Sequence, residues 1–355
     1  RVVESAREAL TMLEPGSEEW LVVLGELAAA EGKLGNPANV FVLGDALESA
    51  PHVEGKEGVR AVAAARIAMQ MALAGDPAAA TVLLAKNVAS EDVLDPVARG
   101  YVFEARSVIA GALGRRGERV RLALHASLEF EVGGDRRNAA LLGGSLGFAM
   151  NELGLYERAK VTLSRAIELA DAVGAKNAIT VARTQLARAQ LRTGGGPGGK
   201  VLLREAIREL VEQKNGRLEG VARVYLAEAL LEDGDPEAGL QVERAVKLLD
   251  VSPPMVAPAL AVLARVRAGE GKVDEALELV NRAADIARTR PILWGEGMVR
   301  YSRFTILELA QRYEESRASR ERAKAWLEAR VEELDDPEFV EAFLAIPEHR
   351  AILDS

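Results

Sequence analysis

A glycine-rich run that ends in lysine is the first place where this sequence could do chemistry. Residues 194–200 are Gly-Gly-Gly-Pro-Gly-Gly-Lys, which fits the G-x-x-x-x-G-K part of a phosphate-binding loop. Such a loop also needs Ser or Thr after the lysine to hold magnesium, and a strand before the first glycine. Here Val201 follows the lysine and 180–193 has a helical pattern. The run therefore predicts an over-long, flexible turn between two helices, not a nucleotide site.

The other reactive side chains are too scattered to predict a catalytic or metal site. Cysteine is absent, which excludes disulfides, thiolate ligands and a cysteine nucleophile. His52, His125 and His349 fit no metal-pair or triad spacing, so we expect them on the surface or between packed helices. Paired glutamates, as at 18–19 and 332–333, are typical of solvated helix faces. We therefore expect neither an enzyme nor a cofactor or metal.

Charge and hydropathy exclude two classes of partner. The chain has 45 Lys and Arg against 54 Asp and Glu, a formal net charge of -9. Nucleic-acid binding needs a broad basic face, and membrane-surface binding is disfavoured likewise. The longest uncharged stretches, 138–151 and 251–264, contain Gly or Pro and are shorter than the roughly 18 residues a bilayer span needs. We predict no nucleic acid and no membrane as partners.

The three tryptophans lie far apart, at Trp20, Trp294 and Trp326. Large aromatic side chains mostly bridge packed elements, so a structural role is the first expectation. The run 291–294, Pro-Ile-Leu-Trp, is the exception, because exposed aromatics are also favoured at interfaces. A contact patch there is the alternative.

The elements that carry these residues follow a regular period. Glycines recur with successive gaps of 43, 39, 40, 40, 40 and 37 residues, and one further step of 40 ends on Gln311. Seven residues before each of these positions the side chain is small in seven of eight cases, with Phe304 as the exception. The recurring glycines are Gly32, Gly75, Gly114, Gly154, Gly194, Gly234 and Gly271.

This period predicts one helical hairpin per repeat. A small residue lets the second helix approach the first, and a left-handed glycine ends the first helix. In 75–77 and 234–236, Gly-Asp-Pro supplies the helix stop, the N-cap and the first-turn proline in that order. Because one hairpin cannot bury its apolar face alone, the hairpins must stack into a continuous core.

These residues resemble the tetratricopeptide repeat. The resemblance is clearest at Leu146-Gly147, at 154–159 with Ala166, and again at Leu263-Ala264, Gly271, Ala276 and Ala283. It implies an all-α, right-handed superhelical solenoid of antiparallel helix hairpins. We expect about eight hairpins over 1–335 and a C-terminal capping segment at 336–355. The family's ordinary repeat has about 34 residues, so a period near 40 implies longer helices.

The repeat length is also similar to the extended repeats of bacterial regulators, including the MalT-like sensors, signalling ATPases and Ser/Thr kinase regulators. The tail from Asp336-Pro337 to Leu353 resembles the sequence that often closes those proteins. This resemblance implies the C-terminal arm of a larger bacterial protein, and the first residue, Arg1, agrees with an excised fragment. A cytoplasmic location is expected, and two copies could pair through their terminal helices.

In the family, ligands usually lie in the concave groove lined by the first helix of each hairpin. The resemblance therefore implies a protein or peptide partner, and the aromatic, amide and arginine side chains suit an extended, carboxylate-bearing peptide. The predicted function is an interaction scaffold or sensor arm; the alternative is a receptor for a small ligand or signalling peptide enclosed by the superhelix. The groove positions are Phe148, Asn151, Thr184, Arg188, Arg192, Glu228, Arg265 and Tyr301.

Overall fold

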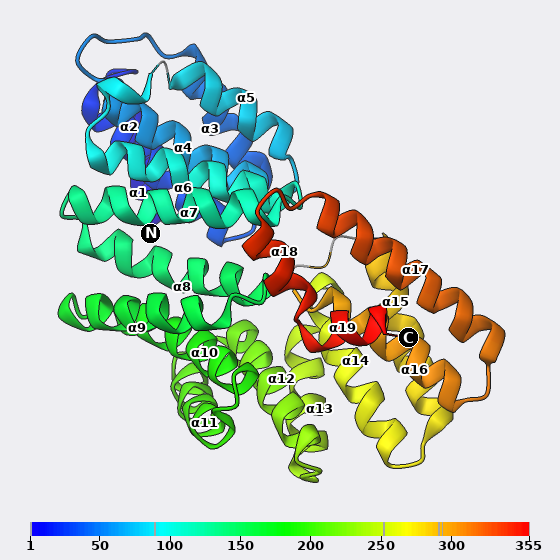
Figure 1. Ribbon diagram of the computed structural model, residues 1–355. Helices are drawn as coiled ribbons and strands as arrows, with labels where there is room; N and C mark the ends of the chain where they lie inside the picture. Colours follow the sequence, from blue (N-terminus) through cyan, green and yellow to red (C-terminus); the bar gives the residue numbers. More distant parts are fainter. Residues whose placement is uncertain (1, 89, 251–252, 290–291, 293, 355) are drawn as a thin grey trace. The chain divides into compact units, whose positions relative to one another are not determined.

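The computed structural model describes residues 2–88, 90–250, 253–289, 292 and 294–354, and it places helices throughout these ranges (Figure 1). No strand occurs among the residues so described. The solenoid of antiparallel helix hairpins predicted from the period is confirmed. The helices are α1 (Val2–Met12), α2 (Glu18–Lys33), α3 (Pro37–Ser49), α4 (Glu57–Leu73), α5 (Pro77–Asn87), η1 (Glu91–Val93), α6 (Pro96–Ala112), α7 (Arg116–Val132), α8 (Arg136–Glu152), α9 (Tyr156–Ala172), α10 (Lys176–Arg192), α11 (Gly196–Glu212), α12 (Gly216–Glu232), α13 (Glu237–Leu249), α14 (Pro253–Gly269), α15 (Val273–Thr289), α16 (Glu296–Leu309), α17 (Tyr313–Glu332), α18 (Pro337–Leu344) and α19 (Pro347–Leu353).

Contacts between helices divide the chain into two compact units, 1–146 and 147–355. The division falls within α8, and the sequence does not mark it. In the first unit, α2 pairs with α3, α4 with α5 and α6 with α7, and the first helices α2, α4 and α6 lie next to one another (Figure 1). Each pair therefore contributes one helix to an inner layer and one to an outer layer.

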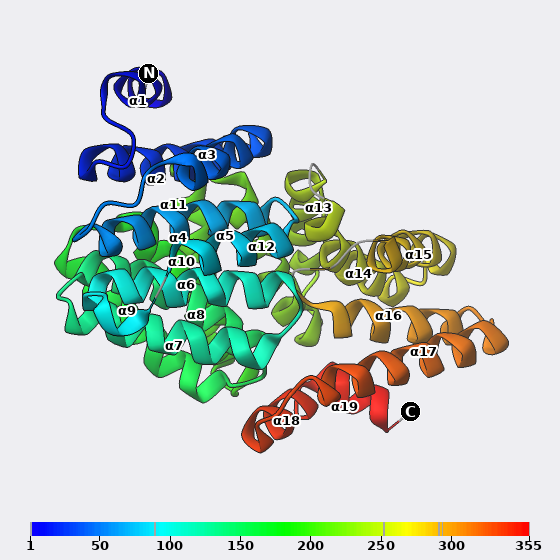
Figure 2. The ribbon, with the colours of Figure 1, turned by 90° about the horizontal axis from the view of Figure 1, so that it is seen from above.

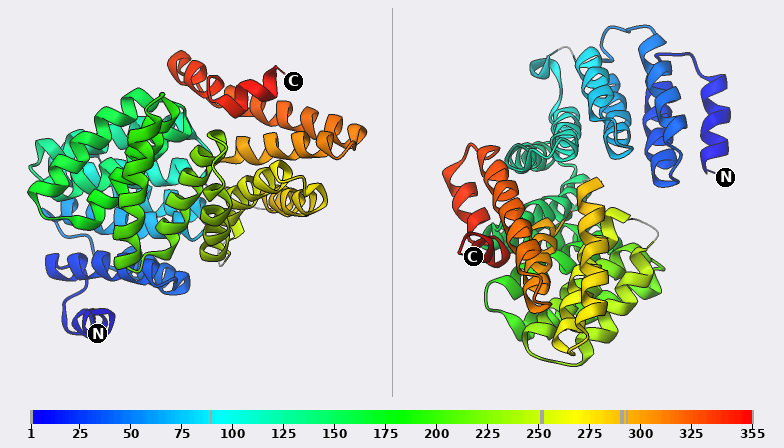
Figure 3. Two further views of the ribbon diagram at one scale, coloured as in Figure 1. Left: turned by 90° about the horizontal axis from the view of Figure 1, so that it is seen from below. Right: turned by 90° about the vertical axis from the view of Figure 1, so that its right-hand side faces the viewer.

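The second unit repeats this arrangement from the end of α8 to α17. Its first helices α10, α12, α14 and α16 contact one another in sequence, and α11, α13, α15 and α17 pack outside them. One hydrophobic core runs through 187–299 and joins α10 to α16. Helices α18 and α19, red in Figures 2 and 3, then fold back beside α16 and α17, which are orange.

The small residue of each repeat allows a close helix crossing, as Gly147 shows in the second unit. A Cβ atom at this position would lie 2.3 Å from Cδ2 of Leu163 on α9. Leu163 is fully buried there, and so is Ala166 one turn later. Larger side chains at position 147 would have to push α9 away.

The turn residues follow the predicted period with one correction. Gly75, Gly114, Gly154, Gly194, Gly234 and Gly271 all have positive φ, and so does Gln311 (φ 60°). Gly32 does not: it lies inside α2, packed against Gln70, and Gly35 (φ 75°) makes the turn. The first interval is therefore 40 residues, from 35 to 75, and the apparent insertion after Gly32 disappears. Both glycines fit a helix end, and sequence alone could not separate them.

The glycine run at 194–200 is a hairpin turn of ordinary length, not the over-long turn that the sequence suggested. Helix α10 ends at Arg192 and α11 begins at Gly196, inside the run. The N–H of Gly195 donates to the carbonyl of Gln190 at 2.8 Å, which closes the end of α10. Lys200 forms an ion pair with Asp233. The lysine thus has a partner within the solenoid.

Candidate functional site

The eight predicted groove positions all lie on first helices of the second unit. Phe148 and Asn151 are on α8; α10 carries Thr184, Arg188 and Arg192; and Glu228, Arg265 and Tyr301 follow on α12, α14 and α16. This spacing repeats because each first helix presents the same face one repeat later. The structure brings several of these residues together and leaves the others apart.

Arg192 and Glu228 meet between α10 and α12. Nη2 of Arg192 lies 3.2 Å from Oε1 of Glu228, and the two side chains are only 12% and 9% exposed. A buried ion pair of this kind is costly to desolvate, so both groups need further partners. Burial raises the pKa of Glu228 despite the opposing charges of Arg192 and Arg188.

Arg188 lies one turn before Arg192 and is equally buried. Its Nη2 atom is 3.2 Å from Oε1 of Glu152 on α8, and its guanidinium lies over the rings of Tyr225 (4.3 Å) and Trp294 (5.7 Å). The two rings meet edge to face, with centroids 5.2 Å apart. Burial alone would lower the pKa of Arg188, but neighbouring groups, including the Glu152 carboxylate, raise it. The arginine therefore stays charged in an aromatic setting.

Glu152 also ties the first repeat of this unit to its last. Its Oε2 atom accepts a hydrogen bond of 3.1 Å from the N–H of Gly295, directly before α16. The residues are 143 positions apart in the chain. Together these groups form what we call the central cluster: Glu152, Arg188, Arg192, Tyr225, Glu228, Trp294 and Glu348.

Glu348, like Glu152 and Tyr225, is a member of the central cluster that the sequence did not indicate. It lies in the first turn of α19, and its Oε1 atom is 2.9 Å from Nη2 of Arg192. Burial would raise the pKa of this carboxyl, but Arg192 lowers it below its ordinary value. The closing segment also contains Asp336, Glu338, Glu341 and Asp354, so the sequence does not single out Glu348 among its acidic residues. Nothing in the repeat pattern connects residues 156 positions apart.

Asn151 adds an amide beside the cluster. Its Nδ2 atom donates to the carbonyl of Gln185 (2.9 Å) and to that residue's Oε1 atom (3.2 Å). Its Oδ1 atom has no hydrogen-bond partner among the residues that the structure describes, and neither has Nε of Arg188 or Nε1 of Trp294. Buried polar atoms are rarely unpaired. These unpaired atoms, together with Nη1 of Arg188 and the hydroxyl of Tyr225, lie on or near the first helices of the second unit.

The remaining predicted positions have local roles. Thr184 donates to the carbonyl of Thr180 at 2.9 Å, within its own helix. Phe148 packs against the hydrophobic core, and Tyr301 meets the ring of Phe304 edge to face at 5.5 Å. Arg265 is half-buried. Its positive charge opposes the rise in the pKa of Glu228, as the charges of Arg192 and Arg188 do. Of these four, Arg265 alone acts on the central cluster through its charge.

The tryptophans and histidines mainly support the helices. All three tryptophans are buried, so Trp294 forms no exposed contact patch. Its neighbours 291 and 293 lie outside the described residues. His349 is buried as well, against Trp326 and Phe343. His125 meets Phe103 edge to face. In the described part of the chain, no group of three or more His, Asp or Glu side chains could hold a metal ion.

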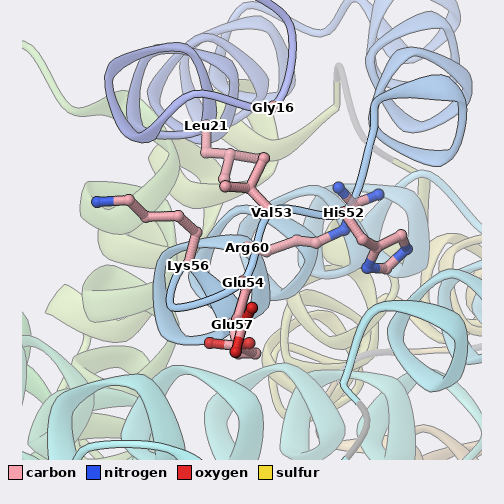
Figure 4. A pocket seen from close by; sticks show the side chains of 8 residues that line it. All are labelled: Gly16, Leu21, His52, Val53, Glu54, Lys56, Glu57 and Arg60. Carbon is pink, nitrogen blue, oxygen red and sulfur yellow. The ribbon is translucent and has the colours of Figure 1, made fainter.

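A small pocket of about 190 Å³ opens in the first unit (Figure 4). Three of its charged side chains already have partners there. Arg60 donates to Asn87 (2.8 Å) and to the carbonyl of Pro51 (3.0 Å), Lys56 pairs with Glu18, and Glu57 accepts from the N–H of Gly55. These bonds hold the 50–57 loop against α4, which is a structural role.

Comparisons with known proteins bear on the fold. No protein-family model and no curated protein sequence matches the chain. A Rap protein complexed with competence and sporulation factor is 14% identical, with a TM-score of 0.65 over 95% of this chain and 98% of that one. NprR in complex with its cognate peptide NprX is 15% identical, with a TM-score of 0.66 over 95% and 96%.

A third similar structure is a signal transduction ATPase with numerous domains and a tetratricopeptide repeat sensor, from Pyrococcus horikoshii. It is 17% identical, with a TM-score of 0.58 over 80% of this chain and 44% of that one. At such identities the likeness concerns the fold. In the described ranges, no helix is long and apolar enough to cross a membrane. Hairpins of about 40 residues, their inner first helices and these similar structures together show that the chain has the fold of the tetratricopeptide-repeat proteins.

Proposed function

We propose that this chain is a protein-interaction module, a scaffold or sensor arm, that binds an extended peptide segment on the first helices of its second unit. The observation that carries the proposal is the set of free polar atoms beside two buried arginines. These atoms are covered in the structure. When a peptide displaces the side chains that cover them, Oδ1 of Asn151 can accept from a peptide N–H, and Nε of Arg188 and Nε1 of Trp294 can donate to a peptide carbonyl. An extended backbone offers both groups along its length.

Two further points support a peptide as the partner. NprR, which shares the fold, is described in complex with its cognate peptide. Aromatic and arginine side chains are also the types that contribute most to binding at protein interfaces. A cytoplasmic location and a larger bacterial regulator as parent belong to this proposal. No catalytic step is part of it.

The small-ligand receptor is not favoured. That function needs a deep, enclosed, apolar pocket. The pocket in the first unit is small, and its lining includes the bonded side chains of Arg60, Lys56 and Glu57. The centre of the second unit is filled by charged and aromatic side chains.

The experiment is selection from a random peptide library on the immobilised full chain. We expect enriched peptides to bind Asn151→Ala and Arg265→Ala variants at least tenfold more weakly than the parent chain. Arg165→Ala, on the outer helix α9, is the matched control and should bind as the parent does. Thermal unfolding checks that each variant folds. Equal affinity for all three variants would contradict the proposed site.

Charge reversal at Arg188 is not a suitable test, although it would change the same surface. Arg188→Glu would place a second carboxylate beside Glu152 in a buried position. Unpaired buried charges destabilise by about 3–5 kcal/mol. The variant would lose its fold, and binding could not be separated from stability.

A further inference from the structure

The C-terminal segment, described over residues 336–354, covers the last hairpin of the second unit. Phe339, Phe343, Ile346 and Ile352 are buried, and α19 contacts both α16 and α17. The approach to α16 is tight, because a Cβ atom on Gly297 would lie 2.3 Å from Nε2 of His349. Every solenoid needs a cap of this kind over its terminal apolar face.

The same segment also reaches the opposite end of the unit, which capping does not require. Glu338 accepts two hydrogen bonds from Nη1 of Arg158 on α9, at 3.0 and 3.1 Å. The turn before α9 lies against α18, since a Cβ atom on Gly154 would be 2.3 Å from the carbonyl oxygen of Ala342. The segment thus spans from the last hairpin to the first of this unit.

Between these two ends, the segment places a carboxylate among the predicted groove residues. Glu348 and Glu228 share one nitrogen, Nη2 of Arg192, at 2.9 and 3.2 Å. If Glu348 leaves, Arg192 keeps Glu228 as its partner. The exchange therefore avoids the large cost of an unpaired buried charge. Another carboxylate can therefore replace that of Glu348 on Arg192.

We propose that the peptide partner places a carboxylate of its own on Arg192 in the position of Glu348, and that the C-terminal segment is an intramolecular competitor which must leave first. The inference rests on the proposed peptide-binding function and adds the partner's chemistry and its regulation. The occupant is an acidic peptide segment. Nearby Asn151 and Arg188 would hold its backbone.

The test uses the full chain and a labelled synthetic peptide with the sequence of residues 336–355. In the parent chain the tethered segment outcompetes the probe, so binding is weak. We expect Glu348→Gln in the chain to raise the affinity for the probe at least tenfold, because the tethered segment then loses its carboxylate. Glu341→Gln is the matched control: it is exposed on the same segment and should change affinity less than twofold. A probe carrying E348Q should bind the Glu348→Gln chain at least tenfold more weakly than the unsubstituted probe.

Hydrogen exchange of residues 337–353 provides the second measurement. Exchange should become faster in the Glu348→Gln chain and stay unchanged in the Glu341→Gln chain. Equal probe affinity for the parent and Glu348→Gln chains, or a probe that binds equally with and without E348Q, would overturn the inference.

Library peptides separate this inference from the proposed function. If they bind the parent and Glu348→Gln chains equally but bind Asn151→Ala more weakly, the peptide-binding function stands, and the proposal that the C-terminal segment competes with the partner is wrong. If no library peptide binds either chain while the probe behaves as expected, the carboxylate site stands and an external peptide partner is wrong.

Discussion

One guanidinium nitrogen of Arg192 contacts two carboxylates, so this arginine is part of a buried charge network. Sequence suggested arginines that face an open groove; the structure has Arg188 and Arg192 buried, each with carboxylate partners. Repeat position predicted which helix face they occupy. It could not predict Glu348, because the closing segment follows no period and returns from 156 residues away. Local pattern carries no information about such a contact.

Glu104 on α6 gives a prediction at the same scale. Burial raises its pKa to about 7, with Arg66 opposing and Asp135 reinforcing the shift. Between pH 4.5 and 7 the folded chain therefore holds a proton that the unfolded chain has released, so stability falls as pH rises through this range. Glu104→Gln should remove much of this pH-dependent loss of unfolding free energy, on the order of 2 kcal/mol. Thermal unfolding midpoints at pH 5 and pH 8 measure it.

The matched control for this prediction is Glu131→Gln, an exposed position on α7 of the same unit. It should keep the pH dependence of the parent chain. If Glu104→Gln shows the same difference between pH 5 and pH 8 as the parent, the assigned titration is wrong.

At the level of helices and turns, the sequence was most informative. The 40-residue period predicted the hairpins and placed Gln311 at a turn, and the structure gives that residue the positive φ of the glycines. The error at Gly32 arose because a glycine inside a helix and one at its end look alike in sequence. The choice between Gly32 and Gly35 depends on packing against Gln70, which lies on another helix.

Gln311 should be a site of easy stabilisation. Its φ of 60° is unfavourable for a residue with a Cβ atom and costs nothing extra for glycine. We expect Gln311→Gly to stabilise the second unit by about 1 kcal/mol. Ala310→Gly, one residue earlier at φ -78°, should instead be neutral or destabilising. Urea unfolding compares the two; stabilisation by both or by neither would count against this account.

Substitutions at Gly154 and Gly194 distinguish the cost of backbone strain from the cost of a clash with the C-terminal segment. Both have positive φ, at 79° and 85°, but only Gly154 has a neighbour where a Cβ atom would be. Gly194→Ala should cost about 1 kcal/mol through its backbone alone. Gly154→Ala should cost clearly more, and it should also speed hydrogen exchange in 337–353, because the new methyl meets the carbonyl of Ala342. Similar losses for the two variants would show that α18 does not press on this turn.

At the level of the whole chain, the repeat pattern predicted the hairpins but not the division into two compact units at 146 and 147. Repeats look alike on both sides of this point, and the contacts that complete the second unit come from its ends. Stability in a stacked repeat protein is usually a sum over neighbours. Because the contacts divide the chain at this point, we expect the stability of each unit to be a separate sum over its own repeats.

Two buried leucines test this division. Leu47 on α3 and Leu163 on α9 are both fully buried, one in each unit. Each change to alanine should cost about 2–5 kcal/mol. We expect hydrogen exchange under mild denaturant to show that Leu47→Ala lowers protection mainly in 2–146, and Leu163→Ala mainly in 147–354. Loss of protection along the entire chain in both variants would mean that it unfolds as one unit.

The bond between Glu152 and the N–H of Gly295, together with the closing segment, has a consequence for how this protein can change over evolution. An open solenoid tolerates duplication or loss of a repeat, because each repeat meets only its neighbours. In the second unit, an added or missing hairpin would move Arg158 away from Glu338 and Glu152 away from Gly295. The number of repeats between these contacts is thereby fixed. Divergence in this half of the chain must proceed by substitution within hairpins.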